Sequence, residues 1–208
     1  PYRLTDEERE LVDKIHASFM NSEKLKKHMR CLFTYGGMYL VCNSNLLYHA
    51  SVPLNEDGSF KHVRIGKKEY WGHKLLQKTD QLIRTAYFDE DGSKEKNFAL
   101  DYMWYMWCGP DAPSFDKDKM ATFERYFIAD KALHKESKGY YYTLRNRADI
   151  CDNILAEFGV EPGPHSHIIN GHVPVKIIKG ERPIKADGKL LVIDGGFSKA
   201  YQPGTGIA

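Results

Sequence analysis

The sequence contains few of the features that mark membrane, secreted or nucleic-acid-binding proteins. It has no run of about 18 apolar residues, so no transmembrane helix is predicted. The first ten residues, PYRLTDEERE, lack the basic start and the apolar stretch of a signal peptide. The formal charge is only +2, from 30 Lys and Arg against 28 Asp and Glu, which predicts no basic surface for nucleic acid or an anionic membrane. We therefore expect a cytoplasmic protein with neither nucleic acid nor membrane as its partner.

Cysteine is also scarce, with four residues at positions 31, 42, 108 and 151. No two of them have the C-x-x-C spacing, and all lie in apolar or helical surroundings. This pattern is typical of reduced, buried thiols and argues against a disulfide framework or a zinc site.

The 208 residues contain no internal repeat and no low-complexity linker, so a single domain is the simplest prediction. A chain of this length buries roughly 70% of its unfolded surface and can form a substantial core. The chain begins abruptly at Pro1, and its last residues, YQPGTGIA, lack a finishing element. We therefore expect a fragment of something longer.

Several helices are predicted from capping residues and apolar spacing. Thr5 and Glu8 form a capping box before a helix, and a short basic helix is expected over 22–30. Further helices are predicted over 67–88, over 97–107 until Gly109-Pro110, around 122–130, and over 147–158 with Gly159 as its end. The aromatic density of the 97–107 segment, including Trp104 and Trp107, favours a place in the core over a ligand platform.

Short apolar runs predict strands between these helices. MYLVC (38–42) and NLLYHA (45–50) are joined by Asn43-Ser44, which is typical of a hairpin. HSHIING (165–171) and KLLVIDGG (189–196) are two further buried strands. Helices and strands in this order predict an α/β layered sandwich.

Two of the nine histidines, His49 and His172, each stand where an apolar strand gives way to a loop. A strand end holds a side chain rigidly and leaves it open to a cleft, as a binding site in a layered α/β fold requires. Spacing alone leaves two interpretations open, a metal ligand or a hydrogen-bonded structural histidine. His165 and His167 form a His-x-His pair that could also bind metal, although a loop is equally compatible with Pro164 and Ser166.

Longer motifs carry a resemblance to a known family. GHVP followed by VIDGG resembles the last motif of the calcineurin-like metallophosphoesterases, and NLLYHASVP resembles their preceding histidine motif. Within that superfamily, LLYHASVPLNEDGSF, INGHVPVK, SFMNSEKLKKHMRCLFTYGGMYL and GERPIKADGKLLVIDGGFSKAYQPGTGIA resemble the class III fructose-1,6-bisphosphatases. The resemblance covers the chain from about Tyr2 to Ala208.

The resemblance implies an incomplete α-β-β-α sandwich with added helices, in which residues 1–208 are the later part of the catalytic domain. It also implies a dinuclear site for divalent ions, manganese above all, with His49 and His172 as ligands of one ion. Arg145 is a candidate phosphate-binding residue, and a solvated arginine at a helix start is the alternative. No spacing rule selects among Lys176, Lys185 and Lys199, and Asp194 is expected to stabilise the turn at Gly195-Gly196.

The chain departs from the superfamily pattern in two ways. Asp-x-His, Gly-Asp-x-x-Asp-Arg-Gly and Gly-Asn-His, which supply the first ion's ligands and the expected general acid, do not occur. His49 is followed by Ala50-Ser51 where Gly-Gly is commoner, which leaves the local backbone geometry in question. We expect the chain to be inactive by itself if the missing motifs lie on another segment.

The function implied is hydrolysis of the 1-phosphate of fructose 1,6-bisphosphate to fructose 6-phosphate and phosphate, in gluconeogenesis. The partner would be a sugar bisphosphate, and a homo-oligomer is left open. Two alternatives remain: a non-catalytic assembly or regulatory domain, and a phosphoesterase of the same superfamily with another substrate. The upstream sequence distinguishes the first alternative, and a comparison of substrates distinguishes the second.

Overall fold

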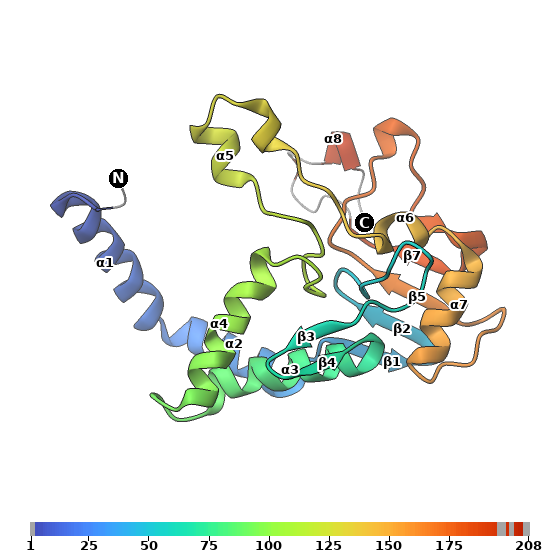
Figure 1. Ribbon diagram of the computed structural model, residues 1–208, viewed down its shortest axis with the longest axis horizontal. Coiled ribbons are helices and arrows are strands. Elements are labelled where there is room, and N and C mark those ends of the chain that lie inside the picture. The colour runs from blue at the N-terminus through green and yellow to red at the C-terminus, as the bar shows by residue number, and fades with distance from the viewer. Residues whose placement is uncertain (1–2, 195–198, 200–201, 206–208) are drawn as a thin grey trace. The chain divides into compact units, whose positions relative to one another are not determined.

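The computed structural model describes residues 3–194, 199 and 202–205 (Figure 1). The chain forms two compact units, Pro1–Gly37 and Met38–Ala208. No helix in the described part of the chain is long and apolar enough to cross a membrane.

The first unit consists of two helices, α1 (Asp6–Met20) and α2 (Glu23–Tyr35). The capping box predicted at the start of α1 is present, because the Glu8 amide donates to the Thr5 hydroxyl and the Thr5 amide donates to the Glu8 carboxylate. Ser22 caps α2 by accepting from the Leu25 amide at 3.2 Å. The second helix was expected to end at residue 30 and continues to Tyr35.

The second unit is built on a five-stranded mixed sheet (Figure 1). Its strands lie in the order β1 (Tyr39–Cys42), β2 (Asn45–Tyr48), β5 (His167–Asn170), β7 (Leu190–Val192) and β6 (Ile184–Lys185). The three central strands β2, β5 and β7 are parallel, and the two outer strands are antiparallel to their neighbours. The carboxyl ends of the parallel strands therefore meet at one edge of the sheet.

The predicted hairpin at Asn43-Ser44 is confirmed. β1 and β2 pair antiparallel, with Cys42 opposite Asn45. Asn43 and Ser44 both have positive φ, 49° and 61°, as the two central residues of a type I′ turn require. This tight turn fixes the register that brings β2 to its end just before His49.

The remaining elements surround the sheet or extend from it. β3 (Val63–Ile65) and β4 (Lys68–Tyr70) form a separate two-stranded sheet. The other elements are α3 (Gly72–Phe88), α4 (Lys94–Cys108), α5 (Thr122–Phe127), α6 (Tyr141–Leu144), α7 (Ala148–Glu157), α8 (Gln202–Thr205) and 3-10 helices at Lys131–His134, Ile177–Lys179 and Ala186–Gly188. The expected helix over 67–88 is wrong at its start, because residues 68–70 pair with β3 and the helix begins only at Gly72.

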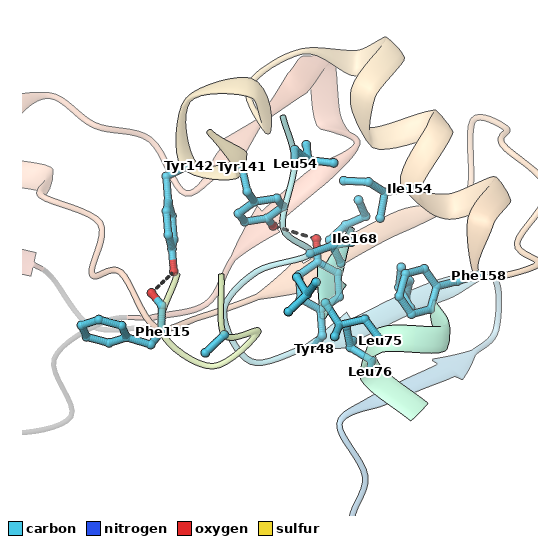
Figure 2. Packing of buried hydrophobic residues seen from close by; sticks show 14 of the residues in the cluster. Tyr48, Leu54, Leu75, Leu76, Phe115, Tyr141, Tyr142, Ile154, Phe158 and Ile168 are labelled. Atoms are coloured by element: carbon cyan, nitrogen blue, oxygen red, sulfur yellow. Dashed lines mark hydrogen bonds between the residues drawn. The ribbon is translucent and has the colours of Figure 1, made fainter. Parts of the chain in front are cut away.

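The core lies on one face of the five-stranded sheet. Leu46, Ile168 and Leu190 are buried on that face of β2, β5 and β7. They pack in one cluster with residues of α3 and α7, including Leu75 and Ile154 (Figure 2). An α/β fold with a mixed sheet and packed helices, as predicted from the order of elements, is therefore confirmed.

The prediction that Trp104 and Trp107 belong to the core is wrong, since they are 70% and 72% exposed. α4 is apolar around much of its surface, and it buries Ala99, Tyr102 and Met106 instead. These three positions are spaced by three and four residues, so they form one stripe of the helix, and the two tryptophans lie off it.

The four cysteines are all free, as predicted, but only Cys151 is buried. Cys31 and Cys42 are exposed and Cys108 is half-buried. The expectation of buried thiols is therefore wrong for Cys31, Cys42 and Cys108.

Candidate functional site at the carboxyl edge of the sheet

The candidate site lies where the three parallel strands end. His49 directly follows β2, Gly171 and His172 follow β5, and Asp194 lies two residues beyond β7. The Gly171 amide donates to the His49 carbonyl at 2.9 Å, and the Val175 amide donates to the Asp194 carbonyl at 3.1 Å. Backbone hydrogen bonds therefore hold the three strand ends together.

The two predicted histidines meet at this edge. His49 Nε2 lies 3.2 Å from His172 Nδ1, and the ring centroids are 5.1 Å apart with an interplanar angle of 71°. His172 adopts a left-handed backbone conformation with φ 66°, which is uncommon for a residue with a side chain. Residues 123 positions apart in the chain thus bring two imidazole nitrogens into contact. The role of each as a metal ligand stays a prediction.

The geometry of the pair suits one divalent ion. In zinc sites an imidazole nitrogen lies about 2.1 Å from the metal, so two ligands at right-angled to tetrahedral positions lie roughly 3.0 to 3.4 Å apart. The observed 3.2 Å falls within this range. The same distance also allows one imidazole to donate a hydrogen bond to the other. Among the residues that the structure describes, no group of three or more His, Cys, Asp or Glu could hold a metal ion.

His172 is held in the form that binds metals. Loss of contact with water lowers its pKa to about 4, and the charges of His49, Lys117, Lys138 and Arg145 add to this effect. The imidazole is therefore neutral near pH 7 and has a free lone pair, as a metal ligand requires.

A buried network of hydrogen-bonded side chains connects the ends of β2 and β5. Asn170, the last residue of β5, donates from Nδ2 to the Ala50 carbonyl at 3.1 Å and to the Tyr141 hydroxyl at 2.7 Å. The Tyr141 hydroxyl is also 2.7 Å from that of Tyr48, the last residue of β2 (Figure 2). Burial raises the pKa of both tyrosines, so the network holds neutral hydroxyls.

Arg145 is buried, which rules out the alternative of a solvated arginine at a helix start. It follows α6, only 6% of it is exposed, and its guanidinium lies 5.8 Å from the Tyr141 ring centroid and 5.3 Å from that of Tyr142. Its Nε and Nη1 atoms have no hydrogen-bond partner among the described residues. A buried cation with two unused donors is well suited to an anion.

The other candidate histidines and lysines form no hydrogen bond or ion pair with His49 or His172 in the described part of the chain. The His167 ring lies at the far end of β5, where Nδ1 is 3.0 Å from the Gly188 carbonyl, and His165 is exposed. Lys176 and Lys199 are exposed and Lys185 is half-buried. The turn expected to involve Asp194 lies at Gly195-Gly196, outside the described residues.

Gly171, between the two histidine loops, has room for a side chain. A Cβ atom added there would lie 3.7 Å from the His49 carbonyl oxygen and 3.8 Å from the Asp194 Cβ, which are ordinary contacts. A side chain at position 171 would therefore not clash with these atoms.

Sequence inspection missed the residues around Tyr142. Its ring centroid lies 6.4 Å from that of His172, and Lys138 Nζ lies 5.5 Å from it. Lys138 occurs in a polar stretch with no motif, so no local signal could have selected it. Tyr142 could have been suspected only from its position three residues before Arg145.

Fold and site together define an α/β protein with paired histidines at the carboxyl edge of a mixed sheet and a buried arginine that packs on Tyr142, whose ring lies near that of His172. The family model of the Firmicute fructose-1,6-bisphosphatases matches residues 1–208, which is the whole chain. The chain therefore belongs to this family.

Curated relatives agree with that assignment. The chain is 83% identical over 208 residues to a class 3 fructose-1,6-bisphosphatase of Bacteroides fragilis, 82% to that of Bacteroides thetaiotaomicron and 59% to that of Clostridium acetobutylicum. Each alignment covers 100% of this chain and 31% of the relative, so the chain spans about a third of the length of these proteins. No solved structure matches the chain.

Proposed function

We propose that this chain forms part of a class 3 fructose-1,6-bisphosphatase that hydrolyses the 1-phosphate of fructose 1,6-bisphosphate to fructose 6-phosphate and phosphate. The observation that carries the proposal is the match of residues 1–208 to the family, together with the meeting of His49 and His172 at 3.2 Å. We infer a cytoplasmic enzyme of gluconeogenesis that consists of this chain and further segments. A homo-oligomer is compatible with this proposal.

The layered sandwich of the calcineurin-like phosphoesterases is the architecture that we propose for the complete protein. One row of side chains supports it: Leu40 pairs with Leu47, Leu47 with Ile169, Ile169 with Leu191, and Leu191 with Ile184. The row crosses all five strands on the face opposite the core, and its outer members Leu40 and Ile184 are 57% and 56% exposed. A second sheet packed on this face would bury the whole row.

His49 and His172 would hold one divalent ion, which we expect to be manganese. When bound, such ions activate a water molecule and stabilise the charge on the phosphoryl oxygens. The donor set fits this role, since His172 is neutral near pH 7 and the two nitrogens have the separation of neighbouring ligands. The remaining ligands and the general acid would come from outside the described residues.

Arg145 would bind the phosphoryl group. Its planar guanidinium can donate two parallel hydrogen bonds to phosphate oxygens, and its Nε and Nη1 have no other partner among the described residues. Contact with the Tyr141 and Tyr142 rings fixes its orientation. Because the site is partly buried, the charge stabilises the developing negative charge more strongly than in water.

The test uses a full-length protein that contains this chain, with His49→Ala and His172→Ala made separately. We expect phosphate release from fructose 1,6-bisphosphate to fall by at least about a hundredfold in each variant, and bound manganese to decrease. His165→Ala is the matched control, because this exposed histidine precedes β5 instead of following it.

Wild-type activity and metal content in both variants would overturn the metal-ligand assignment. Release of phosphate from a phosphoprotein or dinucleotide, with none from fructose 1,6-bisphosphate, would overturn the substrate assignment alone.

A further inference from the structure

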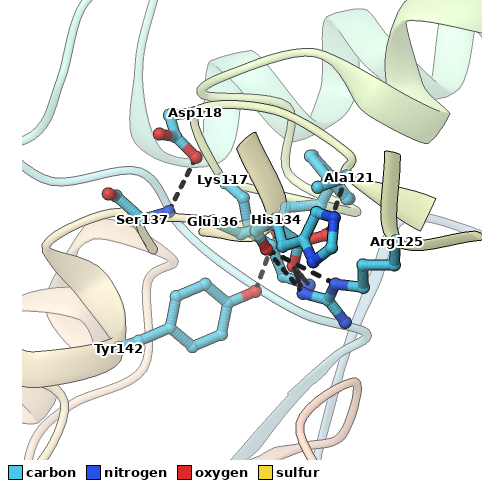
Figure 3. Close-up of polar contacts among 9 residues, drawn as sticks. Lys117, Asp118, Ala121, Arg125, His134, Glu136, Ser137 and Tyr142 are labelled. Carbon is cyan, nitrogen blue, oxygen red and sulfur yellow. Dashed lines mark hydrogen bonds and ion pairs between the residues drawn. The ribbon is translucent and has the colours of Figure 1, made fainter. Parts of the chain in front are cut away.

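Two lysines of the second unit lie opposite each other at the two ends of the segment 118–137. Lys117 and Lys138 form an isolated antiparallel bridge. Next to it the Asp118 amide donates to the Ser137 carbonyl at 2.9 Å, and the Ser137 amide donates to the Asp118 carboxylate at 2.7 Å (Figure 3). Like charges at directly opposed positions are destabilising, so this pairing needs a compensating negative charge.

Only one of the two lysines forms an ion pair within the described chain. Lys117 Nζ lies 3.1 Å from a Glu136 carboxylate oxygen (Figure 3). Lys138 forms no ion pair with any described residue, and its Nζ lies 5.5 Å from the centroid of the Tyr142 ring. The positive charge of Lys138 therefore has no carboxylate within ion-pair distance in the described part of the chain, and Glu181 compensates it only from farther away.

Tyr142 links this lysine to the candidate site. The same ring lies 5.3 Å from the Arg145 guanidinium and 6.4 Å, between centroids, from the His172 ring. The Tyr142 hydroxyl donates to the Phe115 carbonyl at 3.2 Å, which fixes the ring (Figure 2). Lys138, Arg145 and His172 thus surround one immobilised phenol.

We propose that Lys138 and Arg145 together bind the transferred phosphoryl group, as a dianion, beside His172, with Tyr142 as the positioning residue between them. This inference rests on the proposed function and adds Lys138 to its binding site. A phosphate dianion can accept hydrogen bonds from both the ammonium and the guanidinium, and it would place a negative charge directly against Lys138, which forms no ion pair with a described residue.

The electrostatics of Lys138 are consistent with an anion site. Partial loss of contact with water lowers its pKa, and the positive charges of Arg145, Lys117 and Lys176 lower it further. Glu181 opposes this effect only in part. A dianion bound between these cations would attract each of them and so offset their mutual repulsion.

The test compares Lys138→Gln with Lys135→Gln in the full-length protein loaded with manganese. Both changes remove one positive charge from an exposed lysine, but Lys135 lies outside the site. We expect Lys138→Gln to raise the KM for fructose 1,6-bisphosphate and the inhibition constant for inorganic phosphate about tenfold each, as loss of one charge-assisted hydrogen bond implies. Lys135→Gln should leave both constants unchanged.

A second measurement does not depend on turnover. Inorganic phosphate should raise the melting temperature of the wild-type protein and of Lys135→Gln, and this rise should be absent or strongly reduced in Lys138→Gln. A phosphate-induced rise in a protein that does not hydrolyse fructose 1,6-bisphosphate would support the anion site while the proposed function fails.

Two outcomes would overturn the inference while leaving the proposed function intact. The first is unchanged KM and phosphate inhibition in an active Lys138→Gln enzyme. The second is altered inhibition by fructose 6-phosphate with unaltered inhibition by inorganic phosphate, which would assign Lys138 to the phosphate that is not transferred.

Discussion

The side chain of Asn170 donates a hydrogen bond to the backbone carbonyl of Ala50, at 3.1 Å and across 120 positions of the chain. Ala50 directly follows His49, and Asn170 precedes the loop that carries His172. Asn170 is 1% exposed, so the bond forms in a region from which water is excluded. This one amide therefore fixes the two histidine loops relative to each other.

Replacing Asn170 by alanine should lower the free energy of unfolding by about 1–3 kcal/mol, because the buried Ala50 carbonyl loses its donor. The urea midpoint of the protein measures the change. Asn146→Ala is the control, since Asn146 is exposed and should change stability by no more than about 0.5 kcal/mol. Equal midpoints for Asn170→Ala and the wild-type protein would contradict the structural role of the amide.

Gly72→Ala should destabilise the protein more than Gly66→Ala. Both glycines have positive φ, 49° and 61°, which costs a residue with a side chain roughly 1–2 kcal/mol. An added Cβ at Gly72 would also lie 2.2 Å from the Glu157 carboxylate, whereas nothing lies within 4 Å at Gly66. Glu157 would have to move, and it would lose its contacts with the His73 amide and ring at 3.2 and 2.8 Å. Equal losses in the two variants, measured as melting temperatures, would show that Glu157 is not fixed there.

The architecture at the strand ends could be predicted because local signals mark it. The Asn43-Ser44 turn and the apolar strands before His49 and His172 are visible in short windows of the sequence. Trp104 and Trp107 could not be placed, because α4 is apolar around much of its surface and only its packing decides which stripe is buried. The start of α3 was misplaced because Tyr70, Trp71 and Leu75 also have helical spacing.

Arg145 was a candidate phosphate-binding residue from the sequence, but its proposed partner Lys138 could not be predicted, for a different reason. Lys138 and Arg145 meet only through the ring of Tyr142, and the bridge between Lys117 and Lys138 joins residues 21 positions apart in a polar stretch. Neither pair of residues has a sequence spacing that would distinguish it from ordinary charged residues on a surface. The burial of Arg145 is likewise set by tertiary packing.

The cysteines should differ sharply in reactivity. Burial raises the pKa of Cys151 to about 12, with the charge of Asp152 adding to the effect, so its thiolate is scarce at pH 8. Iodoacetamide should modify the exposed Cys31 and Cys42 in the native protein and reach Cys151 only after unfolding. Mass spectrometry of peptides from native and urea-treated samples measures this. Rapid native labelling of Cys151 would contradict its burial.

Asp116 should make stability depend on pH. Burial raises its pKa above the ordinary 3.8, and the hydrogen bond from the Ser51 hydroxyl opposes this only in part. The folded state thus keeps the proton at a pH where the unfolded chain has lost it. The contribution of Asp116 to stability is therefore complete below pH 3.8 and is lost as the pH rises through the folded-state pKa.

Asp116→Asn should remove this dependence, because asparagine can still accept from Ser51 but does not ionise. From pH 4 to pH 7 the urea midpoint should fall less in the variant than in the wild-type protein. The same fall in both proteins would show that the ionisation of Asp116 is not linked to folding.

The bridge between Lys117 and Lys138 has a consequence for how this protein can diversify. The intervening residues 118–137 form a segment whose two ends are joined by this bridge and by the backbone hydrogen bond from Asp118 to Ser137. Lengthening such a closed segment adds little entropic penalty and leaves the strands undisturbed. New sequence could therefore be inserted between residues 118 and 137 without rebuilding the sheet.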